Sequence, residues 1–269
     1  MKVLRDIAYG PHGPRNMLDV YLPEGGTATR PLVVCIHGGG WRGGDKAAFG
    51  WIAERLAARG FVAASITYRF WPDWPCPAAI DDTQRAIRWL RKRAAEYGFD
   101  PERVGALGGS AGSHLAAYAA VAPLRDDSDA ELRGVSSGLQ CVVDCYGPVD
   151  FVAMMDTASA PLVGGFMGQP LTPETAAEYR AASPFFLVKS VPPPFLIVHG
   201  TEDIGVQPGQ VPLTISERFR EVLRRAGGDA TLVPLQGAGH GFSGRPDSPY
   251  AQAMWEAAVP FLEKHLLKQ

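Results

Sequence analysis

The stretch that decides the fold is VGALGGSAG, residues 104–112. Its first four residues form a short β-type run, and residues 108–112 (GGSAG) fit the pattern G-x-S-x-G, ahead of a helical pattern that begins near Ser113. A tight turn from strand to helix needs small residues around the serine if its hydroxyl is to stay exposed in a strained conformation. The same letters could arise from an ordinary turn in a chain with 31 glycines. The position between strand and helix nevertheless makes Ser110 a strong candidate nucleophile.

Short β-type runs alternate with helical patterns on both sides of this stretch, which predicts an α/β domain built on a mostly parallel, eight-stranded sheet with helices on both faces. The turn-rich residues 10–14 predict that the first two strands pair antiparallel. The predicted strands are residues 4–9, 17–22, 32–36, 61–66, 104–107, 139–146, 195–198 and 230–234. Apolar residues at helical spacing predict helices near residues 51–56, 80–90, 215–223 and 250–267.

The 269 residues show no internal repeat and no interdomain linker, so residues 1–269 are predicted to form a single domain. Residues 151–191 have no clear place in the sheet, are rich in Met, Gly and Pro, and precede three prolines. A long excursion of this kind is often a lid or a binding loop. We expect it to line or roof a pocket.

A second glycine-rich stretch, residues 37–41 (HGGGW), directly follows the buried run 32–36. Consecutive glycines let bare backbone N–H groups approach a reacting carbonyl, where a developing oxyanion needs such donors. The N–H of Ala111, at the start of a helix, would add another. Nucleotide binding is the weaker alternative, because no G-K-[ST] follows and no G-x-G-x-x-G is present.

A serine nucleophile needs a base and an acid that orients the base. His240 lies in a loop of small residues between the last strand and the last helix, and is the preferred base. Asp203 follows the strand at residues 195–198, at the edge of the sheet where catalytic groups gather. Glu202 beside it and Asp150 after the preceding strand are the alternative acids. The remaining histidines are assigned to the surface, to loop shaping or to structural roles: His12, His37, His114, His199 and His265.

The composition excludes several classes of protein. Hydrophobic residues make up 46% and charged residues 20%, which suits a folded chain with a large core. The 26 basic and 28 acidic residues nearly balance, which disfavours nucleic-acid and membrane partners. The four cysteines form no CxxC pair and the first ten residues show no signal sequence, so we expect a cytoplasmic protein, or a secreted one if a leader has been removed.

Together these residues resemble the α/β-hydrolase superfamily, in particular bacterial esterases with an HGGGW loop, close to the bifunctional feruloyl and acetyl xylan esterases and related to hormone-sensitive-lipase-like carboxylesterases. The resemblance extends over most of the chain and includes the order Ser110, Asp203, His240. It implies Ser110 as nucleophile, His240 as base and Asp203 as acid. It also implies an oxyanion hole formed by Gly39, Gly40 and Ala111. Other shared segments are LDVYLP (18–23), GDK (44–46), Tyr68-Arg69 and Asp81-Asp82 ahead of Trp89-Leu90.

This chain departs from many relatives at Gly109, where they have a bulkier residue, and at Ser113, where they have glycine. Residues 206–216 also look a few residues longer than usual, so we expect a different pocket rim.

The function implied is a serine carboxylesterase that acts on short-chain acyl esters, such as acetyl or feruloyl esters on plant carbohydrate. It requires no metal and no organic cofactor. Its partner is a small-molecule or carbohydrate-linked ester, and a homodimer is one assembly that this interpretation allows. An arylformamidase or a prolyl-oligopeptidase-like amide hydrolase is the alternative, although such peptidases normally carry a propeller for which this chain has no room. A catalytically dead, ligand-binding fold is least favoured, because all three triad residues are present.

Signals for the substrate are weaker. Trp41, Trp71 and Trp74 could stack against a sugar or an aromatic acyl group, or could simply pack the loops. Met154, with Met155, Phe166 and Met167, is a candidate lining of an adaptable acyl pocket. Since no large cap insertion is evident, a short acyl chain is expected.

Overall fold

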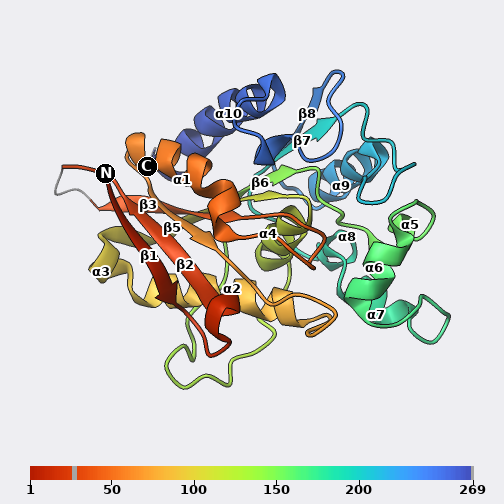
Figure 1. The fold of residues 1–269 in the computed structure, drawn as a ribbon, viewed down its shortest axis with the longest axis horizontal. Helices are drawn as coiled ribbons and strands as arrows, with labels where there is room; N and C mark the ends of the chain where they lie inside the picture. The colour runs from red at the N-terminus through yellow and green to blue at the C-terminus, as the bar shows by residue number, and fades with distance from the viewer. Residues whose placement is uncertain (26–28, 268–269) are drawn as a thin grey trace.

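The computed structural model describes residues 1–25 and 29–267. Eight strands form one sheet in the order β1-β2-β4-β3-β5-β6-β7-β8 (Figure 1). The strands β1, β2 and β4 pair antiparallel, and every pairing from β4 through β3 to β8 is parallel. The strands are β1 Lys2–Ala8, β2 Met17–Leu22, β3 Arg30–Ile36, β4 Val62–Ile66, β5 Phe99–Gly109, β6 Cys141–Cys145, β7 Phe195–Gly200 and β8 Ala230–Leu235. This is the α/β-hydrolase fold.

Helices cover both faces of the sheet. One face packs against α1 and α10, and the other against α2, α4 and α9 (Figure 1). The helices are α1 Gly50–Ala58, α2 Ala78–Lys92, α3 Ala94–Tyr97, α4 Ala111–Val121, α5 Phe151–Met154, α6 Ala160–Met167, α7 Ala176–Ala181, α8 Pro184–Leu187, α9 Leu213–Arg225 and α10 Pro249–Leu262. In the described part of the chain, no helix has both the length and the apolar character that a membrane crossing requires.

The central strands are apolar along their whole length because both of their faces are covered. Along β3, Val34 and Ile36 enter the core beneath α2 and α4, whereas Val33 and Cys35 enter the core beneath α1 and α10. All four side chains are fully buried. The rigid edge that results carries the loops of the site at the carboxyl ends of the strands.

The predicted strands are all confirmed, with shifts at their ends. The strand β5 begins at Phe99, five residues before the predicted start, because Phe99 pairs with Arg30 before a register shift. The helix α4 begins at Ala111, two residues earlier than expected, which places the Ala111 N–H in its first turn.

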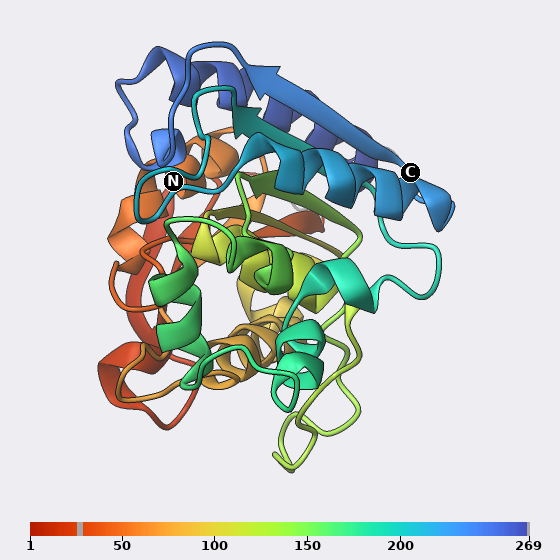
Figure 2. The ribbon, with the colours of Figure 1, turned by 90° about the vertical axis from the view of Figure 1, so that its right-hand side faces the viewer.

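The excursion at residues 151–191 is described throughout and folds into four short helices, α5 to α8, without adding a strand to the sheet. Figure 2 shows these helices together below the sheet, in front of α2 and α4. Phe151, Phe166 and Tyr179 anchor them, since all three side chains are fully buried in the core on this face. The segment is therefore a fixed part of the core that also contributes Pro161 and Leu162 to the main cavity.

Candidate active site

Ser110 occupies a sharp turn between β5 and α4, with φ 54° and ψ −121°. The glycines on either side make this turn sterically feasible. A Cβ on Gly108 would lie 2.4 Å from the carbonyl oxygen of Gly112, and a Cβ on Gly112 would lie 2.0 Å from that of Ile36. Both are backbone atoms and cannot move aside. The strained serine is therefore a built feature of this strand-to-helix turn.

Hydrogen bonds fix the turn to the end of β6. The Ser110 N–H donates to the Cys145 carbonyl over 2.9 Å. The Ser113 hydroxyl donates to the Gly108 carbonyl over 2.7 Å and accepts from the Cys145 N–H over 2.8 Å. The Ser113 side chain thus adds a link that a glycine at this position cannot make.

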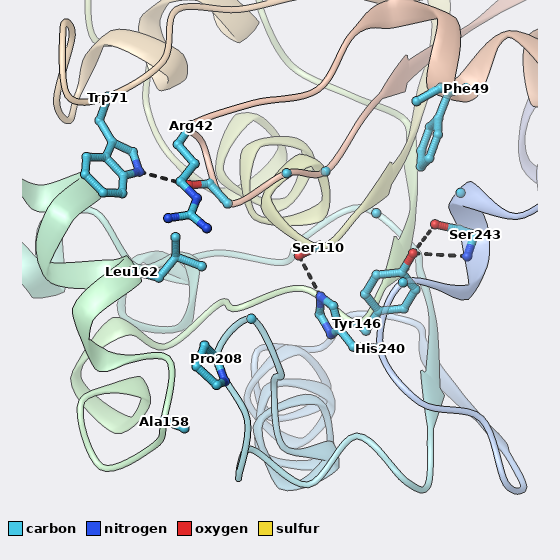
Figure 3. Close-up of a pocket in the computed structure, with 18 of the residues that line it drawn as sticks. Arg42, Phe49, Trp71, Ser110, Tyr146, Ala158, Leu162, Pro208, His240 and Ser243 are labelled. Atoms are coloured by element: carbon cyan, nitrogen blue, oxygen red, sulfur yellow. Dashed lines mark hydrogen bonds between the residues drawn. The ribbon is translucent and has the colours of Figure 1, made fainter.

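A chain of hydrogen bonds joins Ser110, His240 and Asp203. The Ser110 Oγ lies 2.8 Å from His240 Nε2 (Figure 3), and His240 Nδ1 lies 2.6 Å from Asp203 Oδ2. Burial raises the pKa of Asp203, but the hydrogen bonds from His199 and His240 outweigh it and hold that pKa below its usual value. Asp203 is then an ionised acceptor, so His240 carries its hydrogen on Nδ1 and Nε2 is free to accept from the serine hydroxyl. The structure therefore brings together the three residues that the sequence predicted.

His199 is a neighbour of this chain that the sequence analysis assigned only to a structural role. Its Nε2 donates to the Val211 carbonyl over 2.8 Å and lies 3.3 Å from Asp203 Oδ2, while its Nδ1 accepts from the Ser216 hydroxyl over 2.7 Å. The Val211 N–H donates to the other Asp203 oxygen over 2.8 Å. Asp203 is thus held from both sides. The only signal in the sequence was the spacing of four residues between His199 and Asp203.

Tyr146 is a second residue that the sequence did not identify. It follows β6 with φ 48°, and its ring packs edge-on against His240 with centroids 4.7 Å apart. Its hydroxyl is hydrogen-bonded to the Ser243 side chain and accepts from the Ser243 N–H over 3.1 Å. A Cβ on Gly109 would lie 2.6 Å from Ser243 Oγ and 2.8 Å from Phe49 Cζ. The space beside Gly109 is therefore filled by Phe49, Tyr146 and Ser243.

Of the predicted oxyanion donors, Gly39 and Gly40 line the same cavity as Ser110, and Ala111 is the next residue in the chain. Gly39 has φ +113° and Gly40 has φ +61°, both favourable to glycine, and the Trp71 Nε1 donates to the Gly40 carbonyl over 3.0 Å. Among the described residues, none accepts a hydrogen bond from the N–H of Gly39, Gly40 or Ala111. Ala111 is 0% exposed, whereas Gly39 and Gly40 border the cavity.

Ser110 and His240 open into a cavity of about 640 Å³ (Figure 3). It collects residues from loops far apart in the chain. Its lining includes Gly38 to Gly40, Arg42, Ala48, Phe49, Trp71, Tyr146, Ala158, Pro161, Leu162, Pro208, Gly209, Gly241, Ser243 and Gly244. Pro208 and Gly209 belong to the segment after Asp203 that was expected to change the rim.

The substrate-stacking expectation for the tryptophans needs correction. Trp71 lines the cavity, as predicted. Trp41 is only 1% exposed and stacks on Phe166 with centroids 4.5 Å apart, so it does not line the large cavity and borders only a void of about 10 Å³ beside Ser110. Trp74 lies outside the cavity lining, 6.2 Å from His12 between ring centroids. An aromatic side chain that follows a glycine loop packs inward when buried partners such as Phe166 enclose it.

Met154 is buried and does not line the large cavity. It borders a void of about 10 Å³ that also touches Ser110, Leu162 and Val163. Of the predicted acyl-pocket lining, Met154 therefore contributes only to this small void beside Ser110.

The alternative acids lie elsewhere. Asp150 accepts from the Ala153 N–H over 3.0 Å as the cap of α5 and pairs with Arg218 over 3.1 Å. Glu202 is exposed. Across residues 1–25 and 29–267, no group of three His, Cys, Asp or Glu side chains is arranged to hold a metal ion.

Comparison with known proteins gives the family. The BD-FAE family model matches residues 18–221. Esterase LipC of Mycobacterium tuberculosis (strain ATCC 25618 / H37Rv) is 34% identical over 260 residues, which cover 93% of this chain and 63% of that protein. This chain spans between half and two thirds of the length of the first curated relatives that it matches.

Two solved structures cover the whole chain. A truncated carbohydrate esterase from gut microbiota superposes with a TM-score of 0.84 at 28% identity, over 100% of this chain and 97% of that chain. The propionate-bound esterase Est2 of Thermogutta terrifontis superposes with a TM-score of 0.80 at 30% identity, over 100% and 96% respectively. By the extent of the family match and the identity to LipC, this chain belongs to the BD-FAE family of α/β-hydrolase proteins.

Proposed function

We propose that this protein is a carboxylesterase in which Ser110 is the nucleophile, His240 the general base and Asp203 the acid that orients it. One observation carries the proposal: the hydrogen-bond chain from Asp203 through His240 ends at a strained serine that lines a 640 Å³ cavity. The esterase names of the relatives support the same activity.

The reaction proceeds in two halves. His240 Nε2 takes the hydroxyl proton as Ser110 Oγ attacks the ester carbonyl, and the N–H groups of Gly39, Gly40 and Ala111 stabilise the oxyanion. His240 then gives this proton to the leaving alcohol, and the acyl group remains on Ser110. Water, deprotonated by His240, releases the acid and restores the serine. Asp203 keeps the imidazole in the correct tautomer throughout.

The substrate proposed is an ester of a short acyl group, with acetyl esters on plant carbohydrate as the leading example, and feruloyl esters, whose aromatic acyl group would need the large cavity, as the second. The 10 Å³ void that Ser110 shares with Met154 and Leu162 leaves room for little more than a methyl group. The cavity itself is wide enough for an aromatic group or a sugar, with Trp71 on its wall. The propionate-bound and carbohydrate-esterase structures support this substrate class.

The test is hydrolysis of p-nitrophenyl esters from acetate to decanoate, with acetylated xylan and methyl ferulate alongside, by the wild type and Ser110→Ala. We expect acetate and propionate to be preferred and kcat to fall at least about a thousandfold in Ser110→Ala. Turnover that survives this substitution would contradict the proposed nucleophile. An N-formylkynurenine arm decides on the amide alternative, which requires faster turnover of the formamide than of any ester.

A further inference from the structure

We propose that Arg42 binds a carboxylate on the substrate, so that the preferred substrates are esters that carry a negative charge close to the scissile bond. This inference rests on the proposed esterase function and names a finer substrate class for the same cavity.

The backbone that carries Arg42 is fixed. The Arg42 N–H donates to the Gly39 carbonyl over 3.2 Å, and the Trp71 ring donates to the Gly40 carbonyl over 3.0 Å. Trp41, immediately before it, is buried with φ 55°. The arginine side chain therefore extends from a fixed loop, the loop that also contains the proposed oxyanion donors Gly39 and Gly40.

The side chain of Arg42 is exposed and lines the cavity. Figure 3 shows its guanidinium beside Trp71 and Leu162, on one side of Ser110, while Tyr146 lies on the other side. A group on the substrate that extends from the carbonyl toward Trp71 would meet this guanidinium.

The charge of Arg42 is not compensated within the described chain. Among the described residues it forms no ion pair, whereas Arg69 and Arg85 pair with Asp82 and Asp129. No Asp, Glu or Lys, and no second Arg, is among the residues that line the cavity. Arg42 is thus the one side chain with a permanent charge among the lining residues, and the other walls are largely glycine, proline and hydrophobic side chains, which screen charge less than water does.

Guanidinium chemistry selects the ligand. Arginine stays protonated at any physiological pH, and its planar fork matches the two oxygens of a carboxylate. The carboxylate would replace water on an exposed cation, so no internal ion pair has to break first. Neutral esters of the same shape would lack this interaction.

The test compares two pairs of esters that differ in charge. In 4-acetoxybenzoate and its methyl ester, the charge lies on the alcohol part; in p-nitrophenyl hemisuccinate and p-nitrophenyl butyrate, it lies on the acyl part. We expect kcat/KM for the anionic ester, divided by that for its neutral partner, to fall at least about tenfold in Arg42→Gln for one of the pairs. Arg42→Lys should retain part of the ratio, because the charge remains without the fork.

Arg133→Gln is the matched control, since Arg133 is exposed, lies outside the cavity lining and forms no ion pair among the described residues. The ratios should be unchanged in this variant. Unchanged ratios for both pairs in Arg42→Gln would overturn the inference and make Arg42 an ordinary solvated arginine. The pair that responds tells whether the carboxylate belongs to the alcohol or to the acyl part.

Calorimetry with benzoate, and with benzamide as its neutral control, gives a readout that needs no turnover. We expect benzoate to bind the wild type more tightly than benzamide does, and to lose that advantage in Arg42→Gln. If the wild type hydrolyses no ester but binds benzoate through Arg42, the proposed function fails and the anion site stands. If the wild type hydrolyses neutral esters and Arg42→Gln changes neither the kinetic ratios nor benzoate binding, the proposed function stands and the anion site fails.

Discussion

Ser110 is held in a backbone conformation that costs about 1–3 kcal/mol for a residue with a side chain. Its surroundings enforce this conformation: Gly108 and Gly112 are too crowded for any Cβ, and Cys145 accepts the serine N–H. Such strain persists only where packing fixes it. At the scale of the residue, the site is therefore sensitive to single methyl groups near the turn.

Gly109→Ala tests this sensitivity. The added methyl would lie 2.6 Å from Ser243 Oγ and 2.8 Å from Phe49 Cζ, so these side chains must shift, and Tyr146 with them. We expect the free energy of unfolding to fall by about 1–3 kcal/mol. We also expect lower kcat, because the Tyr146 ring packs against His240. Urea unfolding and kinetics with p-nitrophenyl acetate measure both effects.

Gly43→Ala is the control for that substitution, because a Cβ there meets nothing within 4 Å. Equal free energies of unfolding and equal kcat for Gly109→Ala and Gly43→Ala would show that the space beside Gly109 is not tightly filled.

His199→Asn tests whether the buried histidine positions Asp203. The substitution removes the 3.3 Å contact to Asp203 Oδ2 and the bond to Val211. The pKa of Asp203 should rise, since a hydrogen bond to its charged form is lost. We expect kcat to fall about tenfold with little change in KM, because the contact orients the base rather than the substrate.

Ser216→Ala is the matched control, as it removes only the hydrogen bond on the far side of the same ring. A role confined to packing would lower the thermal stability of both variants and leave kcat of His199→Asn unchanged.

Local sequence was enough to select Ser110, Asp203 and His240 as candidates, because each lies in a short motif that follows a predicted strand. Trp41 could not be placed in this way. Its burial depends on Phe166 and His114, which are distant in the sequence. The contact of His199 with Asp203 likewise depends on how the chain after β7 returns to the sheet.

At the scale of elements, α4 connects the proposed oxyanion loop to the excursion. His114, on α4, accepts a hydrogen bond on Nδ1 from the Trp41 Nε1 over 3.2 Å. Its Nε2 donates to the Ala182 carbonyl, between α7 and α8, over 2.8 Å. The neutral, buried imidazole of His114 thus links α4, the loop at residues 37–41 and the excursion at residues 151–191.

This histidine makes stability depend on pH. Burial lowers the pKa of His114 to about 4, against 6.5 for the free group. Between these values the unfolded chain binds a proton that the folded chain does not, so stability falls as the pH falls from 6.5 toward 4. The loss due to this one group between pH 7 and pH 5 is about 2 kcal/mol.

We therefore expect His114→Gln to be less stable than the wild type at pH 7 but to lose less stability on going to pH 5. Urea unfolding of both proteins at the two pH values measures the difference. Identical losses would mean that the imidazole is protonated, or exposed, in the folded state.

Helices could be predicted from periodicity where one spacing dominates, as in α2, and central strands from continuous apolar runs, as in residues 32–36. The four helices of the excursion could not, because they are short and their apolar residues, such as Phe151 and Phe166, follow no single repeat. Contacts with the core determine their ends.

At the scale of the molecule, parallel strands bring residues from distant parts of the chain to one edge. Ser110 follows β5, Tyr146 follows β6, Asp203 follows β7 and His240 follows β8. These four strands are consecutive neighbours in the sheet. Once the alternation of strands and helices predicts a parallel sheet, residues that follow its strands are expected at one edge. Tyr146 belongs to no motif, so its place beside His240 could be found only in the structure.

The central claim is that Ser110 is the nucleophile, activated by His240. Intact-protein and peptide mass spectrometry after brief incubation with paraoxon tests it most directly, since an activated serine hydroxyl displaces p-nitrophenolate and takes up the phosphoryl group faster than other side chains do. We expect one diethyl phosphoryl group per chain, located on Ser110, with none on Ser110→Ala and a rate at least about a hundredfold lower in His240→Ala. A label on another residue, or equal labelling of Ser110→Ala, would contradict the claim.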